Sequence, residues 1–249
     1  MPHIRLPEPG IPYVLVDRAQ ESTLLRVNQD TVIALYKAHG ALLFRGFGTD
    51  LASFGDFARQ FCSTSVHNES PGRDLIDPVR NVHSVDHGNA AFPLHPELSR
   101  EAWRPDVAFF ACLKPPAAGG ATTICDGVEL VRELPAAVRQ GLTGRRLVHY
   151  LGTWPGLLQF WLGTATPDDA LLAAPPQSCP YKFRRINGRI MRAFSRPALY
   201  RPMFSEDLAF GNFLLFARYM NGRRDFPVCQ LAKLILIKSF PPAALHAWP

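Results

Sequence analysis

A histidine and a glutamate stand two positions apart in the segment FPLHPELSR, residues 92–100. Residues at positions i and i+2 of a strand point to the same side, so the imidazole of His95 and the carboxylate of Glu97 could reach one metal ion. This pair of ligand types suits Fe(II), and a second histidine would complete a facial set of three ligands with open positions. The alternative is two ordinary polar residues on a strand edge. A second pair with the same spacing, His67 and Glu69, shows that spacing alone does not decide between them.

Two short motifs lie on either side of the first pair. The strand motif RGF, residues 45–47, precedes it, and the glycine turn PPAAGGAT, residues 115–122, follows it. In this order and spacing the chain resembles the TauD/TfdA-like family of Fe(II)- and 2-oxoglutarate-dependent dioxygenases. The resemblance covers about residues 30–130 and is looser over 190–228. It favours the first pair over the second, because only the first lies one strand before the glycine turn.

The resemblance implies a mainly β fold with flanking helices, built on a double-stranded β-helix of the jelly-roll, cupin-like type. It implies an enzyme that uses Fe(II), the cosubstrate 2-oxoglutarate and O2 to hydroxylate or otherwise oxidise a small molecule, such as an amino acid or a natural-product precursor. His95 and Glu97 would be iron ligands, and the Thr122 hydroxyl would help to hold a carboxylate of 2-oxoglutarate. The alternative for Thr122 is a β-branched residue that suits a strand, and Thr123 is the candidate in the other register.

The C-terminal part departs from the family's pattern. The family places its third ligand in a DN…HGR motif, followed by an arginine that binds the far carboxylate of 2-oxoglutarate, and neither occurs in this sequence. His246, in AALHAWP, is the candidate third metal ligand, and the alternative is a mobile residue of the chain terminus. Arg218 is a candidate for the missing arginine. Residues 230–249 form an atypical tail, and a truncated or altered C-terminus would leave the jelly roll without its last strands.

Two further hypotheses follow from these departures and from the charge. The chain could be a truncated, catalytically impaired dioxygenase homologue that acts as a binding protein or pseudoenzyme. It could also be a basic binding module without a metal, since the net charge is +6. However, the 27 Lys and Arg residues are scattered, so no nucleic-acid partner is expected. A modest positive field would also attract small anionic substrates.

Composition favours one domain over residues 1–249. Hydrophobic residues make up 47% of the chain, charged residues only 19%, and 23 Pro with 18 Gly suit strands joined by loops. The chain opens without an apolar leader and has no apolar run long enough for a membrane helix, so a cytoplasmic protein without a membrane partner is expected. The five widely spaced cysteines suit a reducing compartment. The patterns indicate no oligomeric state.

Apolar periodicity predicts the elements that would position the site. Helices are expected over 28–40, with Gly40 as C-cap, and over 51–63, with a buried strand at 41–48 between them. A long loop is expected over 64–91.

The second half of the chain is expected to begin with strands at 105–115 and 121–127. A helical region at 127–144 follows, with Asp126 as N-cap and a break at Pro135. Several residues are expected to have structural roles: His149 packed in a strand, Trp103 and Trp154 in packing, Asn212 in a buried segment at 210–220, and His83 and His87 in the long loop.

Overall fold

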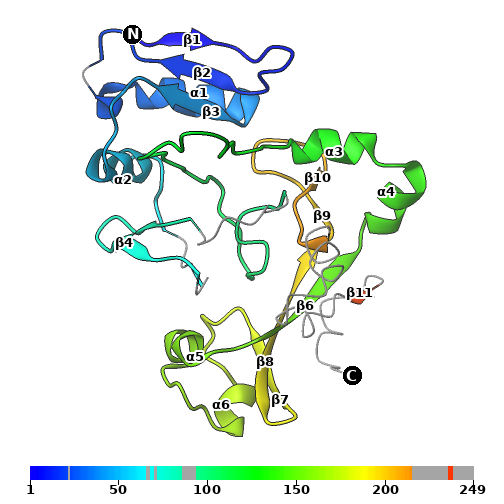
Figure 1. Ribbon diagram of the computed structural model, residues 1–249. Helices are drawn as coiled ribbons and strands as arrows, with labels where there is room; N and C mark the ends of the chain where they lie inside the picture. The colour runs from blue at the N-terminus through cyan, green and yellow to red at the C-terminus, as the bar shows by residue number, and fades with distance from the viewer. Residues whose placement is uncertain (22, 66–67, 70–71, 86–93, 215–234, 238–249) are drawn as a thin grey trace. The chain divides into compact units, whose positions relative to one another are not determined.

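A computed structural model describes residues 1–21, 23–65, 68–69, 72–85, 94–214 and 235–237 (Figure 1). The chain divides into two compact units. The N-terminal unit comprises Met1–Ala90 and Val107–Thr122, and the C-terminal unit comprises Ala91–Asp106 and Thr123–Pro249. A single domain over residues 1–249 stays a prediction.

The N-terminal unit is built on a three-stranded sheet with one helix packed on it. Strand β2 (Val14–Asp17) pairs antiparallel with β1 (His3–Arg5) and parallel with β3 (Leu42–Arg45). The parallel pair requires a crossover, which a 3-10 turn, η1 (Leu24–Arg26), and helix α1 (Gln29–His39) provide. The predicted strand at 41–48 is thus confirmed as β3, although its residues are half-buried to exposed rather than buried.

The limits of α1 follow from local signals at both ends. The Asn28 side chain accepts a hydrogen bond from the Thr31 amide at 2.8 Å, which satisfies one of the free amides of the first turn. Gly40 ends the helix with φ of 76°, a left-handed conformation that glycine adopts at little cost. The predicted helix at 28–40 and its C-cap are therefore confirmed.

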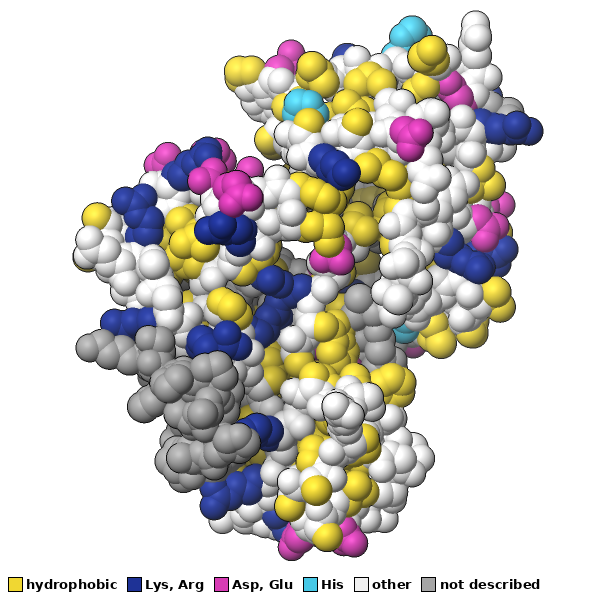
Figure 2. All heavy atoms as spheres, turned by 180° about the vertical axis from the view of Figure 1, so that it is seen from behind, with side chains coloured by type: hydrophobic (Ala, Val, Ile, Leu, Met, Phe, Trp, Pro, Cys, Tyr) yellow, Lys and Arg dark blue, Asp and Glu magenta, His cyan; other side chains and the backbone are white. Residues whose placement is uncertain are grey.

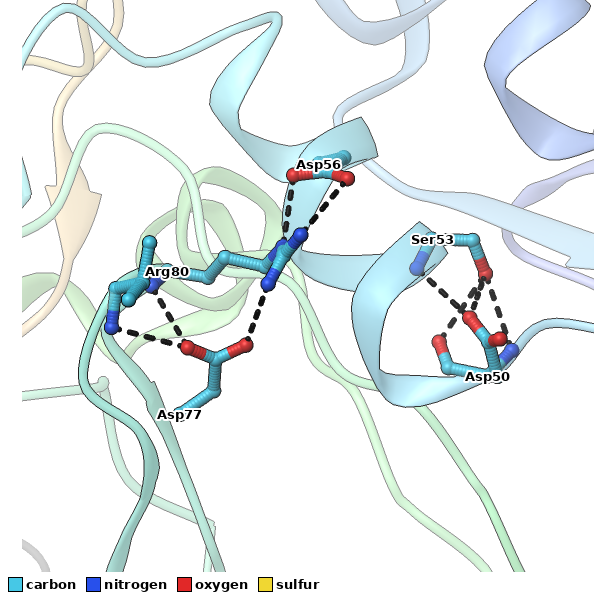
Figure 3. Close-up of polar contacts among 6 residues, drawn as sticks. Asp50, Ser53, Asp56, Asp77 and Arg80 are labelled. Carbon is cyan, nitrogen blue, oxygen red and sulfur yellow. Dashed lines mark hydrogen bonds and ion pairs between the residues drawn. The ribbon is translucent and has the colours of Figure 1, made fainter.

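Helix α2 (Leu51–Arg59) and a short hairpin are joined by an arginine with two acidic partners (Figure 3). The hairpin consists of β4 (Leu75–Asp77) and β5 (Val82–His83). Arg80 bonds both carboxylate oxygens of Asp56 on α2, at 2.7 and 3.2 Å, and one oxygen of Asp77 at 3.0 Å. The predicted helix at 51–63 is confirmed, whereas the expectation that 64–91 is only a loop was wrong, because this ion-pair network fixes a hairpin within it.

The aromatic core of the N-terminal unit draws one ring from the separate segment at 107–122. Phe57, 2% exposed, contacts Phe44, Phe61 and Phe109 edge to face at centroid distances of 4.9–6.3 Å. The neighbouring Phe110 is 61% exposed. Residue 109 thus anchors the segment while its neighbour faces outward.

The predicted strands at 105–115 and 121–127 do not form among the described residues. Neither stretch pairs with another described strand, and a strand exists only where a neighbour accepts its backbone hydrogen bonds. The turn between them is present. Gly119 and Gly120 both have φ of 72°, and a Cβ on Gly120 would lie 2.5 Å from the Cγ of Pro116.

The C-terminal unit is built on an antiparallel sheet of order β11-β6-β8-β7 (Figure 1). Strands β7 (Lys182–Ile186) and β8 (Arg189–Pro197) form a hairpin, and β6 (Arg146–Gly152) and β11 (Ile235–Ile237) extend it. Asn187 and Gly188 close the hairpin with φ of 49° and 74°, as a two-residue turn of positive φ requires.

Short helices surround this sheet. Helices α3 (Gly127–Glu133) and α4 (Ala136–Leu142) form the predicted helical region, with Asp126 as N-cap and the break at Pro135 both confirmed. The unit also contains helices α5 (Pro155–Leu162) and α6 (Asp169–Ala173) and the strand pair of β9 (Leu199–Tyr200) with β10 (Ala209–Phe210).

The described residues form four small sheets with helices, a mixed architecture, and no closed barrel. The expected jelly roll is therefore not seen in this part of the chain. None of the described helices is long and apolar enough to cross a membrane. On the face drawn in Figure 2, basic side chains lie in several separate places among acidic and apolar ones.

Candidate metal centre

His95 and Glu97 lie in an irregular segment and a turn of the C-terminal unit, not on a strand as expected. The turn is closed by the amide of Ser99 on the carbonyl of Pro96, at 3.2 Å, and by the amide of Glu101 on the carbonyl of Leu98, at 3.1 Å. Leu98 has φ of 51°, a left-handed conformation that is uncommon for leucine. The two side chains are therefore brought together by a tight turn rather than by the two-residue repeat of a strand.

The two donor atoms are close enough to share a metal ion. Nε2 of His95 lies 3.9 Å from Oε1 of Glu97, and the side chains are 21% and 24% exposed. Metal–nitrogen and metal–oxygen bonds in such sites are each about 2.0–2.2 Å, so two ligands of one ion lie at most about 4.3 Å apart. At these bond lengths the 3.9 Å separation corresponds to an angle of about 135° at the ion, so the two side chains must move about 1 Å closer to occupy adjacent positions of a facial set. Within the described part of the chain, no group of three or more His, Cys, Asp and Glu residues is arranged to hold one.

A buried arginine holds this turn on the sheet. Nη1 of Arg196, near the end of β8, donates to the carbonyl oxygens of Leu98 at 3.3 Å and Glu101 at 3.1 Å. Arg196 is 7% exposed, and Ser99 and Glu101 are also buried. The backbone that follows Glu97 is thereby attached to a central strand, which limits the movement of the candidate ligands.

The same face of the sheet carries further polar groups. Register pairs Leu147 with Arg196, His149 with Phe194 and Leu151 with Arg192, so these six side chains lie on one face. His149 stacks on Phe194 with ring centroids 4.5 Å apart and is 3% exposed. Burial, followed by the nearby charges of Arg196 and Arg100, lowers the pKa of His149 to about 4. The predicted packing of His149 in a strand is confirmed.

Other residues considered from the sequence have packing roles. Trp103 and Trp154 pack against the core around α5 and β8, and Arg192 lies over the rings of Trp154 and Tyr181. Asn212 is buried and donates to the carbonyl of Ala198. The packing roles predicted for these residues are therefore confirmed.

Thr122 belongs to the N-terminal unit, whereas His95 and Glu97 belong to the C-terminal unit. Thr122 and Thr123 are exposed, and neither is in a strand. Their role toward 2-oxoglutarate stays a prediction. His246, the candidate third ligand, lies outside the described residues, as do His67, His87 and Arg218.

The family model described as taurine catabolism dioxygenase TauD, TfdA family, matches residues 14–201. The chain belongs to the TauD/TfdA family. The resemblance noted in the sequence is thus confirmed, and the matched region includes His95, Glu97, Thr122 and Arg196 but ends before His246. A search of curated proteins found no match.

Sequence reasoning missed Arg196, which links the candidate ligand turn to the sheet. A signal was present. In RIMRAFSRP, Arg192, Phe194 and Arg196 alternate with other residues and so share one face of a strand. Two arginines on the same face of a strand as an apolar phenylalanine predict buried guanidinium groups, and such groups need specific hydrogen-bond partners.

Proposed function

We propose that this TauD/TfdA-family protein is an Fe(II)- and 2-oxoglutarate-dependent oxygenase that hydroxylates or otherwise oxidises a small molecule. The observation that carries the proposal is the 3.9 Å separation of the His95 and Glu97 donor atoms, on a turn that Arg196 attaches to β8. Membership of the family supports the reaction type and, with it, a jelly-roll core. The substrate class, an amino acid or a natural-product precursor, rests on analogy alone.

His95 and Glu97 would hold the iron, and His246 is the proposed third ligand. Bound iron would supply the family's chemistry, in which O2 oxidises a substrate while 2-oxoglutarate is converted to succinate and CO2. Arg196 keeps the ligand turn in place through the two backbone carbonyls, and the Thr122 hydroxyl would donate a hydrogen bond to a carboxylate of the cosubstrate. Both ligand side chains are partly exposed, so the metal site is open to exchange with solvent.

A second candidate function is a binding protein that keeps a carboxylate site without turnover. The ligand pair itself bears on it, because His95 and Glu97 supply two donors and the described residues hold no group of three His, Cys, Asp and Glu that could bind a metal ion. The two candidates differ in whether succinate accumulates when O2 is admitted to the loaded protein.

Anaerobic addition of Fe(II) and 2-oxoglutarate tests the proposal directly. We expect the visible charge-transfer band of the iron chelate, and we expect the variants His95→Ala and Glu97→Ala to lose it. His39→Ala, which removes an exposed histidine at the end of α1, is the matched control and should leave the band unchanged. A folded protein without the band, or a band that persists in His95→Ala, would contradict the proposal.

A further inference from the structure

The candidate ligand turn is attached to the sheet at a third backbone group besides the two carbonyls that Arg196 binds. The amide of Ala102 donates a hydrogen bond to Oη of Tyr181 at 3.4 Å. Tyr181 lies directly before β7, whereas Arg196 belongs to β8 and binds the carbonyls of Leu98 and Glu101. The two side chains thus attach the turn to both strands of one hairpin.

The hydroxyl of Tyr181 is held in place by the packing of its ring. The side chain is 1% exposed, and the guanidinium carbon of Arg192 lies 4.7 Å from the ring centroid. Four further rings surround it at centroid distances of 5.7–6.2 Å, those of Trp103, Trp161, Phe183 and Phe194. A ring in such a close-packed interior keeps one orientation, so its hydroxyl stays directed at the amide of Ala102.

The chain that follows Ala102 is held by its side chains as well. Trp103 packs against Trp161 with ring centroids 5.1 Å apart, and the guanidinium carbon of Arg104 lies 3.4 Å from the ring centroid of Tyr200. Gly211 leaves room for this stack, because a Cβ there would overlap Cε1 of Tyr200. The backbone is therefore fixed from the ligand turn to Arg104.

This attachment affects how tightly the ligand pair can bind a metal ion. The donor atoms of His95 and Glu97 are 3.9 Å apart and have to come about 1 Å closer to occupy adjacent positions on the ion. Rotation of the two side chains can provide this movement, because the contacts described here hold the backbone that follows them. A backbone that is fixed before the metal arrives loses less freedom on binding, which is the advantage of a preorganised site.

We propose that Tyr181 is a positioning residue of the candidate metal centre. Its hydroxyl, through the amide of Ala102, keeps the turn that carries His95 and Glu97 in a metal-binding arrangement and so raises the affinity for a divalent transition-metal ion. Tyr181 itself is not a ligand. The effect on metal affinity rests on the function proposed above, whereas the attachment of the turn by Tyr181 does not.

Hydrogen exchange of the metal-free protein, followed amide by amide, tests the attachment alone. Tyr181→Phe removes the hydroxyl and keeps the ring, so the core stays filled. We expect the amide of Ala102 to exchange about tenfold faster in this variant, with a smaller increase at Ser99 and Glu101, whose amides close the turn. The amides of β6 and β8 should keep their protection.

Tyr150→Phe is the matched control, because it removes the same hydroxyl from the other face of the sheet. Tyr150 follows His149 in β6, and successive side chains of a strand point to opposite faces. Exchange in the ligand turn should change less than about twofold in this variant. Unchanged exchange of the Ala102 amide in Tyr181→Phe would overturn the proposal.

Calorimetric titration with Co(II), together with the visible spectrum of the bound ion, tests the effect on the metal centre. His95→Ala should abolish this binding, which shows that the titration reports the candidate centre. Tyr181→Phe should raise the dissociation constant about five- to tenfold and shift the visible bands, because a loosened turn changes the ligand geometry. Tyr150→Phe should change the constant less than about twofold.

Leu172→Ala separates positioning from general stability. Leu172 is 4% exposed and belongs to the same core cluster as Tyr181, but it does not contact the ligand turn through a hydroxyl. This variant should unfold at a lower urea concentration than Tyr181→Phe and still bind Co(II) with a dissociation constant within about twofold of wild type. Equal losses of affinity in the two variants would overturn the positioning role.

The two experiments distinguish a failure of this proposal from a failure of the proposed function. Wild type that binds Co(II) through His95, with unchanged or tighter binding in Tyr181→Phe, would overturn the positioning role and leave the proposed function intact. Wild type that binds neither Co(II) nor Fe(II) would contradict the metal centre and, with it, a positioning role toward a metal. The exchange rate of the Ala102 amide would still decide whether Tyr181 attaches the turn.

Discussion

The guanidinium groups of Arg80, in the N-terminal unit, and Arg196, in the C-terminal unit, have opposite electrostatic surroundings. Arg80 faces two carboxylates, those of Asp56 and Asp77, and they raise its pKa above the usual value for arginine (Figure 3). Arg196 donates to two backbone carbonyls, and burial with the nearby Arg104 lowers its pKa to about 10. The first charge is bonded directly by carboxylates of the same unit, whereas the second is bonded by uncharged carbonyls.

The difference separates an arginine held by acidic side chains from one held by backbone carbonyls. The two acids around Arg80 more than offset its single positive charge, so a ligand anion would have to compete with them. The carbonyls that Arg196 contacts carry no net charge, and Glu101 is the acidic residue that acts on its charge. The N-terminal unit thus uses its charged groups to join a helix to a hairpin. The C-terminal unit places charge inside its sheet, next to the candidate metal ligands.

The largest effect is expected for Leu147→Ala, at the residue in register with Arg196. Leu147 is 0% exposed, and its truncation should lower the free energy of unfolding of the C-terminal unit by about 2–5 kcal/mol. Urea unfolding followed by hydrogen exchange can measure this loss for each unit. Val14→Ala, at an equally buried residue of the N-terminal unit, is the control and should lower protection there instead. A loss below about 1 kcal/mol for Leu147→Ala would show that this face is not a packed interior.

A smaller effect is expected from acid, through His149 on the same face. The pKa of His149 is about 4 in the folded state, against 6.5 for the free side chain. Between these values the unfolded chain binds a proton that the folded chain does not bind, so stability is full above about pH 6.5 and falls as the pH approaches 4. The loss amounts to as much as about 3 kcal/mol.

His149→Phe is the matched variant, because a phenylalanine keeps the ring stacked on Phe194 but cannot be protonated. Stability curves of wild type and variant from pH 7 to pH 4, measured by urea unfolding, should diverge as the pH falls, with wild type losing more. Parallel curves would contradict a buried neutral histidine and weaken the comparison between the two units.

Local signals in the sequence predicted much of the fold. Asn28 and Gly40 delimit α1, and Asp126 and Pro135 delimit α3 and α4, because caps and helix breaks act on the neighbouring backbone. The strands expected at 105–115 and 121–127 do not form among the described residues, because strand formation is not a local property. An apolar run favours a strand, but the strand also needs a pairing partner that the local sequence does not specify.

The candidate site could be predicted only in part for a similar reason. The short spacing of His95 and Glu97 keeps them near each other in almost any backbone, and the turn brings their donor atoms to 3.9 Å. The link from Arg196 to the carbonyls of Leu98 and Glu101 spans more than 90 positions, and depends on how β8 packs. The alternation of side chains along a strand can predict that Arg196 is buried, but it cannot predict which carbonyls Arg196 contacts.

The smallest predicted effect compares one substitution in the two units. A Cβ on Gly55, within α2, would lie 2.5 Å from Cδ and 2.8 Å from Cβ of Arg80. Since Asp56 and Asp77 hold Arg80 in place, Gly55→Ala should lower the free energy of unfolding by about 1 kcal/mol despite the better helix propensity of alanine. A Cβ on Gly141, within α4, has no such neighbour within 4 Å, so Gly141→Ala should raise the free energy of unfolding by about 0.5–1 kcal/mol. Thermal and urea unfolding of the two variants measure both signs. A gain for Gly55→Ala would mean that Arg80 moves freely, and the contrast between Arg80, held by carboxylates, and Arg196, held by carbonyls, would then lose its structural basis.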